Sequence, residues 1–429
     1  VWVWIGLAGI LTHFAYLIFT LICSPVPSWW MVAPDAREYV TAAQSILNGT
    51  YQSMPDDPHG IFQYYRPPAY PALVALFSIL TGTSPVSGWF VVLNPVFVSV
   101  LCISIYHIAR ILGFSSSVAI IAGFLAAFSP TTLSVVPLLL TDIPTAAVLA
   151  VSLWLLGKGA KSASVRHAVA AGTLVGIATL MRPAAIVAVV LWPLFLLLWP
   201  KRAQIHRVSF IVMVLISVLP SFIWSLHVRN HTGILTVATS MKSHAYHGIS
   251  AALATRSDSR IQEAAVNNLA ARRAHAIESR QITNERDRIA WESAQTDSLL
   301  ARYRDAAIPA FAKSAALLLL SPTKDFAAQF PNASTKLGRN PPRIVSSVRF
   351  LLIAWGLIAL VLARQYRVAV IFIFLICGVL VPNLSIGGLG AQRHMLGASV
   401  PMFIALGYGV SDLVHRLRIR KHAGLPHGR

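Results

Sequence analysis

Long apolar segments separated by short basic junctions are the feature that most constrains how this chain can fold. Of its 429 residues, 56% are hydrophobic and only 12% are charged, whereas a soluble domain carries roughly 25% charged residues. Several apolar runs reach the roughly 18 residues that a helix needs to cross a bilayer, so the chain is predicted to be an all-α polytopic membrane protein with about ten transmembrane helices. The runs lie at residues 3–23, 89–109, 116–138, 142–157, 168–181, 183–200, 208–226, 346–363, 367–388 and 395–413.

The positions of Lys and Arg predict the topology. Every second junction between apolar segments is basic, and basic junctions stay on the cytoplasmic side. Both termini should then be cytoplasmic, with long outer loops at 24–88 and 227–345. We expect one transmembrane domain over residues 1–413 and a basic cytoplasmic tail over 414–429. The basic junctions contain Arg110; Lys158, Lys161 and Arg166; Lys201, Arg202 and Arg207; Arg364 and Arg367; and Arg416, Arg418, Arg420 and Lys421.

Two shorter apolar stretches, 67–82 and 307–321, would invert this pattern if either crossed the membrane alone. We therefore expect them to form re-entrant or interfacial helices on the outer face. The net charge of +20 would suggest a nucleic-acid partner in a soluble protein. Here the basic residues flank apolar segments or lie in the second outer loop, so no nucleic acid is expected. Each of the three cysteines lies in an apolar run, which excludes a disulfide framework and a metal-ligand spacing.

Asp35 and Glu38 open a short helical pattern in the first outer loop, which ends at Asn48-Gly49. One interpretation is a capping box, with Asp35 as the cap and Glu38 three residues later. The other is a carboxylate at an outer membrane surface that accepts a proton from a hydroxyl group. The two roles do not exclude each other.

Arg66 stands before Pro67-Pro68 in the same loop. A residue that precedes proline is restricted to extended geometry, which would fix this guanidinium at a helix entrance. A planar guanidinium suits bidentate contacts to phosphate. The alternative is an ordinary interfacial arginine whose apolar stem is buried while its charged head reaches water.

Asp142 and three arginines stand at expected outer ends of apolar segments. Asp142 could serve only the helix dipole, but an ionisable residue at membrane depth is a functional candidate. Arg182, Arg229 and Arg393 occupy outer positions against the charge bias. Each alone could be an interfacial residue, whereas the set, placed beside carboxylates, predicts a site for a lipid phosphate.

The Asp35-x-x-x-Tyr39 pattern, followed by the stretch 65–71, resembles the first outer loop of the dolichyl-phosphate-mannose protein mannosyltransferase and aminoarabinose transferase superfamily. These are membrane glycosyltransferases of the C-type fold. One departure concerns the residue after Asp35, which is Ala36 here but an acidic residue or Arg in many relatives. Further matches follow in the expected order: Ser129-Pro130, Leu139-Leu140-Thr141-Asp142, Met181-Arg182-Pro183, Trp224 with Arg229-Asn230, and Gln392-Arg393.

The resemblance implies a sugar donor attached to a polyprenyl phosphate and chemistry, usually inverting, on the outer face of a bacterial inner or plasma membrane. It implies that Asp35 is the catalytic base and that Asp142 is a second acid near the site. The acceptor could be a lipid, a glycan or a protein. No cofactor is expected; a divalent metal is compatible with the site but is not indicated. The residues expected to bind substrate are Arg37, Glu38, Tyr39, Arg66, Arg182, Arg229 and Arg393.

Two other functions remain open from the sequence. A transporter or flippase of a lipid-linked or anionic solute could use the same outer arginines as an entry site. Such a protein should carry ionisable residues near the middle of the membrane and matched broken segments in two halves, whereas here the charges collect at the outer edge. A polymerase or ligase of surface glycans would share the donor chemistry and differ in its acceptor.

Overall fold

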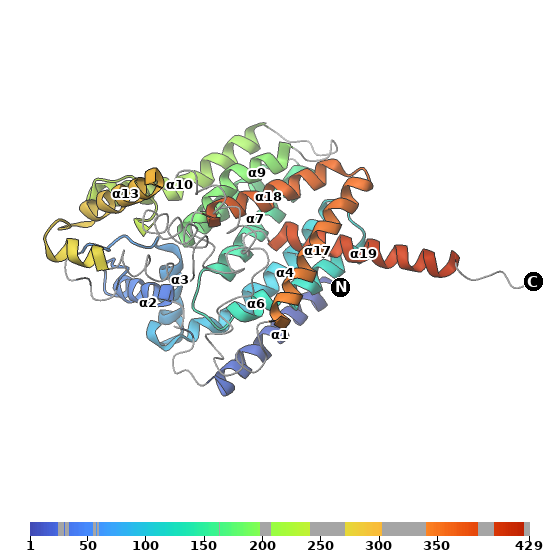
Figure 1. The fold of residues 1–429 in the computed structure, drawn as a ribbon, viewed down its shortest axis with the longest axis horizontal. Coiled ribbons are helices and arrows are strands. Elements are labelled where there is room, and N and C mark those ends of the chain that lie inside the picture. Colours follow the sequence, from blue (N-terminus) through green and yellow to red (C-terminus); the bar gives the residue numbers. More distant parts are fainter. Residues whose placement is uncertain are drawn as a thin grey trace, which may run out of the picture.

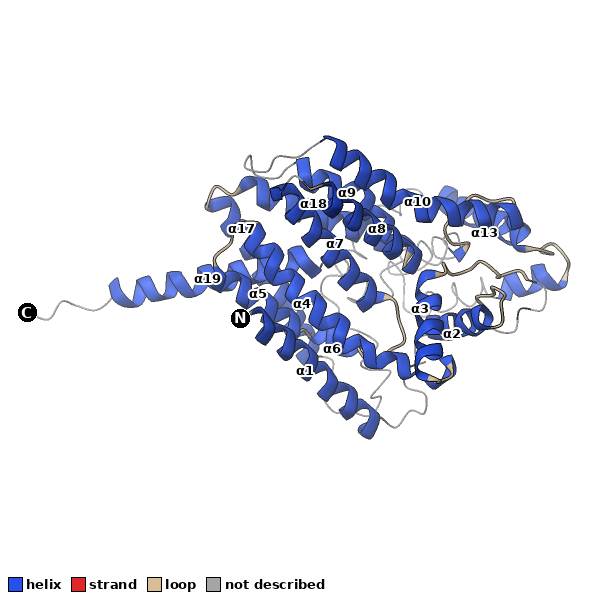
Figure 2. Ribbon diagram, turned by 180° about the vertical axis from the view of Figure 1, so that it is seen from behind, coloured by secondary structure: helices blue, strands red, loops and turns tan. Residues whose placement is uncertain are grey.

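The computed structural model describes residues 1–24, 30, 34–54, 57, 60–162, 164–197, 207–240, 271–302, 340–384 and 399–423. Over these residues the fold is helical and has no β-strand (Figures 1 and 2), which confirms the predicted all-α class. The bundle contains α1 (Trp2–Cys23), α4 (Asn94–Ile111), α5 (Ser116–Ala127), α6 (Pro130–Val135), α7 (Asp142–Ser162), α8 (Val165–Met181), η4 (Pro183–Ile186), α9 (Val187–Leu197), α10 (Arg207–Thr232), α17 (Asn340–Leu362), α18 (Tyr366–Leu384) and α19 (Ser399–Ala423).

Within the described ranges, five helices are long and apolar enough to cross a membrane. Four shorter apolar helices accompany them; one of these, α3 (Ala69–Thr81), occupies the stretch expected to be interfacial. The other such stretch, 307–321, lies outside the described residues. The five long helices are Trp2–Cys23, Trp89–Ile111, Ser116–Val135, Asp142–Ser162 and Ile211–Thr232.

Two boundaries differ from the sequence-based expectation. The apolar run 116–138 is broken at Ser129, because Pro130 cannot continue the hydrogen bonding of α5 and starts α6 instead. At the other end of the chain, α19 continues through Ala423. It therefore passes the expected boundary at residue 413 and includes much of the expected basic tail.

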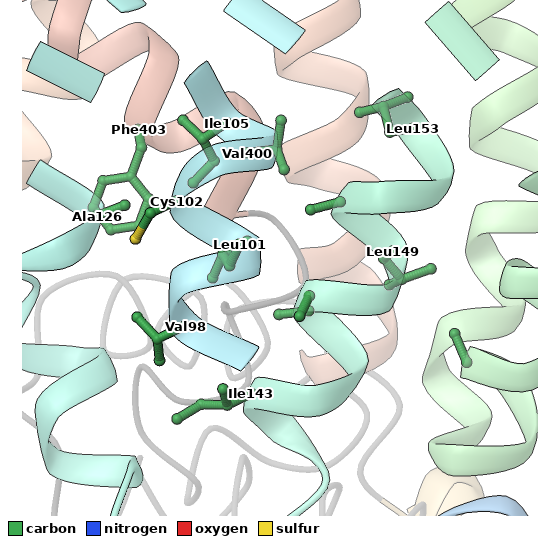
Figure 3. Packing of buried hydrophobic residues seen from close by; sticks show 14 of the residues in the cluster. Val98, Leu101, Cys102, Ile105, Ala126, Ile143, Leu149, Leu153, Val400 and Phe403 are labelled. Atoms are coloured by element: carbon green, nitrogen blue, oxygen red, sulfur yellow. The ribbon is translucent and has the colours of Figure 1, made fainter. Parts of the chain in front are cut away.

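Helix α4 lies at the centre of the buried core, between α5, α7 and α19 (Figure 3). Lipid tails are as apolar as leucine, so membrane helices associate through close packing more than through the hydrophobic effect. Small residues permit this closeness: a Cβ added to Gly356 of α17 would clash with the carbonyl oxygen of Ala405 in α19. The core side chains seen in Figure 3 include Val98, Leu101, Cys102, Ile105, Ala126, Ile143, Leu149, Leu153, Val400 and Phe403.

The helices α2 (Pro34–Leu47) and α13 (Glu285–Arg302), which belong to the two long loops, lie at one end of the described structure (Figure 1). Helix α3 shares this end, whereas the start of α1 and the end of α19 lie away from it (Figure 1). The 3-10 helices η2 (Pro85–Ser87) and η3 (Trp89–Leu93) connect α3 to α4. Segments of the two outer loops therefore meet at this end of the helical bundle (Figure 1).

Candidate active site

Helix α2 carries Asp35 and Glu38 into the site. Its inward face is apolar, with Ala36, Val40 and Ala43 buried. Pro34 is the first helical residue, because its fixed φ suits that position, so Asp35 lies inside the first turn. The capping-box interpretation stays a prediction. Residues three apart share one helix face, and both carboxylates use that face to bind an arginine.

Arg66 is the arginine between these two carboxylates. Its Nη2 lies 2.9 Å from Oδ1 of Asp35, and its Nε donates a hydrogen bond to Oε2 of Glu38. The guanidinium carbon lies 5.4 Å from the ring centroids of Tyr39 and of Tyr65, within range of cation–π attraction. We call Asp35, Glu38 and Arg66 the site cluster.

Backbone hydrogen bonds fix Arg66 as well. Its N–H donates to Oγ of Ser53 at 3.1 Å, and its carbonyl accepts from the hydroxyl of Tyr51 at 2.6 Å. Two prolines follow, and α3 begins at Ala69. Arg66 therefore stands at a helix entrance, as its sequence context predicts.

A second ion pair joins α7 to the end of α8. Nη1 of Arg182 lies 2.5 Å from Oδ1 of Asp142, whose side chain is 4% exposed. Tyr39 connects the two ion pairs: its ring lies beside Arg66 and its hydroxyl shares a hydrogen bond with the side chain of Thr141. The structure thus brings together three predicted carboxylates and two predicted arginines.

A buried hydroxyl beside this pair lacks a partner. Tyr70 is fully buried, and its ring packs edge-on against Tyr39 at 4.9 Å. Its hydroxyl has no hydrogen-bond partner within the described chain.

Burial dominates the electrostatics of the site cluster. Burial raises the pKa of Glu38, and the positive charge of Arg66 opposes this rise. For Arg66 itself burial lowers the pKa, but the negative groups around it, Asp35 first, more than reverse that effect. Asp35 is the most accessible acid: its side chain is 30% exposed, compared with 13% for Glu38.

Three other predicted residues lie outside these contacts or outside the description. Arg37 is exposed on α2, and Arg229 is exposed in the last turn of α10. Arg393 lies outside the described residues. Over the described ranges, no three His, Cys, Asp or Glu side chains converge in a way that could hold a metal ion.

A second charged group, which the sequence patterns did not indicate, lies in the other outer loop. Arg273, Glu285, Arg288 and Glu292, which we call the loop cluster, are joined by three ion pairs. The spacing of residues 285, 288 and 292 places them on one helix face and is the signal that could have revealed them.

A cavity of about 380 Å³ borders the loop cluster. It lies between the first outer loop, the end of α10 and the start of α13. Its lining residues are Gly60, Gln63, Tyr64, His231, Thr232, Gly233, Asn284, Glu285 and Arg286.

Residues 65–224 match the model of the dolichyl-phosphate-mannose-protein mannosyltransferase family. This match begins at Tyr65, beside the arginine of the site cluster, and includes Asp142 and Arg182. No curated protein sequence matches the chain.

Solved structures of similar fold include the archaeal oligosaccharyltransferase AglB from Archaeoglobus fulgidus in complex with an inhibitory peptide and a dolichol-phosphate. It is 12% identical, with a TM-score of 0.52, over 100% of this chain and 52% of that one. The same enzyme tethered to an acceptor peptide gives a TM-score of 0.57 at 13% identity, over 98% of this chain and 50% of that one. The chain thus spans about half the length of that enzyme.

A weaker similarity, with a TM-score of 0.37 at 16% identity, is to ArnT from Cupriavidus metallidurans bound to undecaprenyl phosphate, over 96% of this chain and 80% of that one. The family match and the oligosaccharyltransferase fold confirm the resemblance found in the sequence: this chain is a membrane protein with the C-type glycosyltransferase fold, and its residues 65–224 are similar to the dolichyl-phosphate-mannose-protein mannosyltransferases.

Proposed function

We propose that the protein is an integral-membrane glycosyltransferase that moves a sugar from a polyprenyl-phosphate donor to an acceptor hydroxyl. The observation that carries this proposal is the Asp35–Arg66 pair, which presents a partly exposed carboxylate at the loop end of a C-type fold. A positioned carboxylate can take a proton from a hydroxyl in the transition state.

In the proposed reaction the acceptor oxygen attacks the anomeric carbon while Asp35 takes its proton. The bond between that carbon and the phosphate oxygen breaks, and the polyprenyl phosphate leaves with the electron pair. A single displacement of this kind inverts the anomeric centre. Glu38 and Tyr39 hold Arg66, which orients Asp35 through their ion pair. Asp142 is the second acid of the site, and it holds Arg182 through their ion pair.

The charge of the leaving phosphate needs compensation, because ionic interactions strengthen where water is excluded. We propose Arg66, Arg182, Arg229 and Arg393 for this role, with Arg37 at the exposed rim. The donor class is supported by the matched family's description and by the dolichol-phosphate in the oligosaccharyltransferase structure. The acceptor class stays open between lipid, glycan and protein; peptides occupy that same enzyme.

We propose that this chemistry takes place on the outer face of a bacterial inner or plasma membrane. The loop helices and the start of α1 lie at opposite ends of the molecule (Figure 1), as the basic junctions require. A reporter fused after Arg166 should therefore read cytoplasmic, and one fused near Asn48 should read outside. If both report the same side, the orientation is wrong.

The test of function uses purified protein in liposomes with a labelled polyprenyl-phosphate sugar. We expect the label to leave the lipid at a rate that depends on the protein. The transporter interpretation predicts no such loss and predicts movement of a solute across the vesicle membrane. If the donor stays intact after long incubation and a solute moves across the vesicle membrane, the enzyme proposal is wrong and the transporter interpretation takes its place.

A further inference from the structure

Three of the four charges in the loop cluster lie where solvent barely reaches; the fourth, Arg273, has a side chain that is 20% exposed. Arg288 and Glu292 are 0% exposed, and Nη1 of Arg288 lies 2.8 Å from Oε2 of Glu292. Arg288 also lies 3.4 Å from Glu285, and Arg273 lies 3.2 Å from Glu292. Burying a charge is costly unless good geometry and further hydrogen bonds compensate it. Such a cluster therefore requires partners beyond its own ion pairs.

Those partners are the residues immediately before Arg66. Both carboxylate oxygens of Glu285 accept the N–H of Tyr64 at 3.3 Å. Nε of Arg288 donates to the carbonyl of Ile61 at 2.9 Å. About 220 residues of chain separate these partners, so the contact joins the two outer loops directly.

A short backbone pairing strengthens this junction. The N–H of Thr239 donates to the carbonyl of Tyr64 at 3.1 Å, and the N–H of Ser240 donates to the carbonyl of Tyr65 at 3.4 Å. The hydroxyl of Thr239 donates to Glu285. The segment that leads into Arg66 is thus held by α13 and by residues 239–240 together.

The ring of Tyr65 lies between the two clusters. Its centroid is 5.4 Å from the guanidinium carbon of Arg66 and also 5.4 Å from that of Arg288. A shift of Arg288 would therefore act on the aromatic ring that contacts the catalytic-site guanidinium. Phe62, at 4.8 Å, contacts Arg288 as well.

We infer that Glu285 and Arg288 are positioning residues, which hold the Tyr64–Arg66 segment so that the Arg66 guanidinium meets Asp35. The expected effect on donor turnover rests on the proposed function, whereas the geometric part does not. The alternative is a purely structural role, in which the loop cluster only keeps the second outer loop folded. The two accounts differ in whether the segment before Arg66 loosens while α13 stays intact.

The main test is the charge-balanced variant Glu285→Met/Arg288→Met, which leaves the Arg273–Glu292 pair in place. Hydrogen exchange of the full-length protein should rise about tenfold or more in peptides covering Ile61–Arg66, because a bond to a charged group is lost. Peptides from α13 should keep their protection. Glu285→Gln, which retains an acceptor for the Tyr64 N–H, should show most of the wild-type protection. Asp297→Asn, at an exposed position on the same helix, should match the wild type.

Donor kinetics supply the second readout. The apparent KM for a labelled polyprenyl-phosphate sugar should be about tenfold higher in the double variant than in the wild type. In Glu285→Gln the apparent KM should stay close to the wild-type value. Adding Arg66→Lys to the double variant should cause little further loss, since residues that act through one another are not additive.

The outcomes separate this inference from the proposed function. Unchanged exchange at Ile61–Arg66 with an intact α13 would overturn the inference, as would loosened exchange with unchanged donor kinetics. Failure of the wild type to consume donor would reject the proposed function, while exchange would still decide the geometry. If α13 unfolds in the double variant, the test uses Thr239→Val instead, because this variant removes only the hydroxyl that donates to Glu285. It should then raise exchange at Ile61–Arg66 a few-fold with α13 protected, and no rise would count against the inference.

Discussion

The site cluster and the loop cluster use the same side-chain chemistry in different surroundings. In each, an arginine lies between carboxylates and its guanidinium contacts two aromatic rings, one of which, Tyr65, is shared. They differ in exposure. The Asp35 side chain is 30% exposed, whereas Arg288 and Glu292 are fully buried.

This difference assigns the roles. A general base must reach the proton that it removes, and of these carboxylates Asp35 is the one with substantial access. Arg288 and Glu292 of the loop cluster are fully buried and cannot meet a substrate unless the loops open, which fits the positioning role that we infer for this cluster. In our proposals, similar ion pairs support chemistry in the site cluster and hold the chain in position in the loop cluster.

Removing a charge from the loop cluster should have the largest effect on stability. Glu292→Gln leaves Arg288 and Arg273 without their shared carboxylate, which should lower the opening free energy of α13 by about 3–5 kcal/mol. Hydrogen exchange of α13 peptides measures this value, with Asp297→Asn, at an exposed position of the same helix, as the control. Exposed ion pairs contribute below about 1 kcal/mol. A change in the opening free energy below that value would show that the loop cluster is solvated, and the two clusters would then not differ in burial.

Changing the arginine of the site cluster should affect donor binding more than stability. Arg66→Lys retains the charge but loses the fork that spans Asp35 and Glu38, so the apparent donor KM should rise about tenfold. Arg66→Ala should raise it further. Steady-state kinetics with labelled donor measure both, and Arg272→Lys, at an exposed position, is the control. If both Arg66 variants have the wild-type KM for the donor, Arg66 does not bind the donor phosphate.

The pH dependence should show a smaller effect, through Glu38. Burial raises the pKa of Glu38, so this group takes up its proton at a higher pH than an ordinary glutamate, whose pKa is about 4.3. Its contribution to stability is therefore present below the ordinary pKa and is lost as pH rises through the raised one.

When Glu38 is protonated, its carboxyl group no longer neutralises part of the Arg66 charge, so Arg66 attracts a phosphate more strongly. The donor KM should therefore fall a few-fold as pH drops through the raised pKa. In Glu38→Gln that step should be missing and the KM low throughout. A step of the same size in Glu38→Gln would mean that another group titrates.

Sequence patterns predicted the helical class and much of the site, because both depend on local signals. Apolar length marked the long helices, and Asp35, Arg66, Asp142 and Arg182 were each visible beside a helix end. The ion-pair partner of Asp35 was not visible in the local pattern, because Arg66, which binds its carboxylate, is 31 residues away. The loop cluster was missed for a similar reason: Glu285 meets Tyr64 across 221 residues, and no local pattern reports such a contact.

The account depends most on Asp35 as the base, and Asp35→Asn tests this directly. Asparagine keeps the shape of the side chain at the start of α2 but cannot take the proton. Discharge of sugar from a labelled polyprenyl-phosphate donor should fall at least about 100-fold, while thermal unfolding stays near that of the wild type. Near-normal discharge by well-folded Asp35→Asn protein would contradict the assignment.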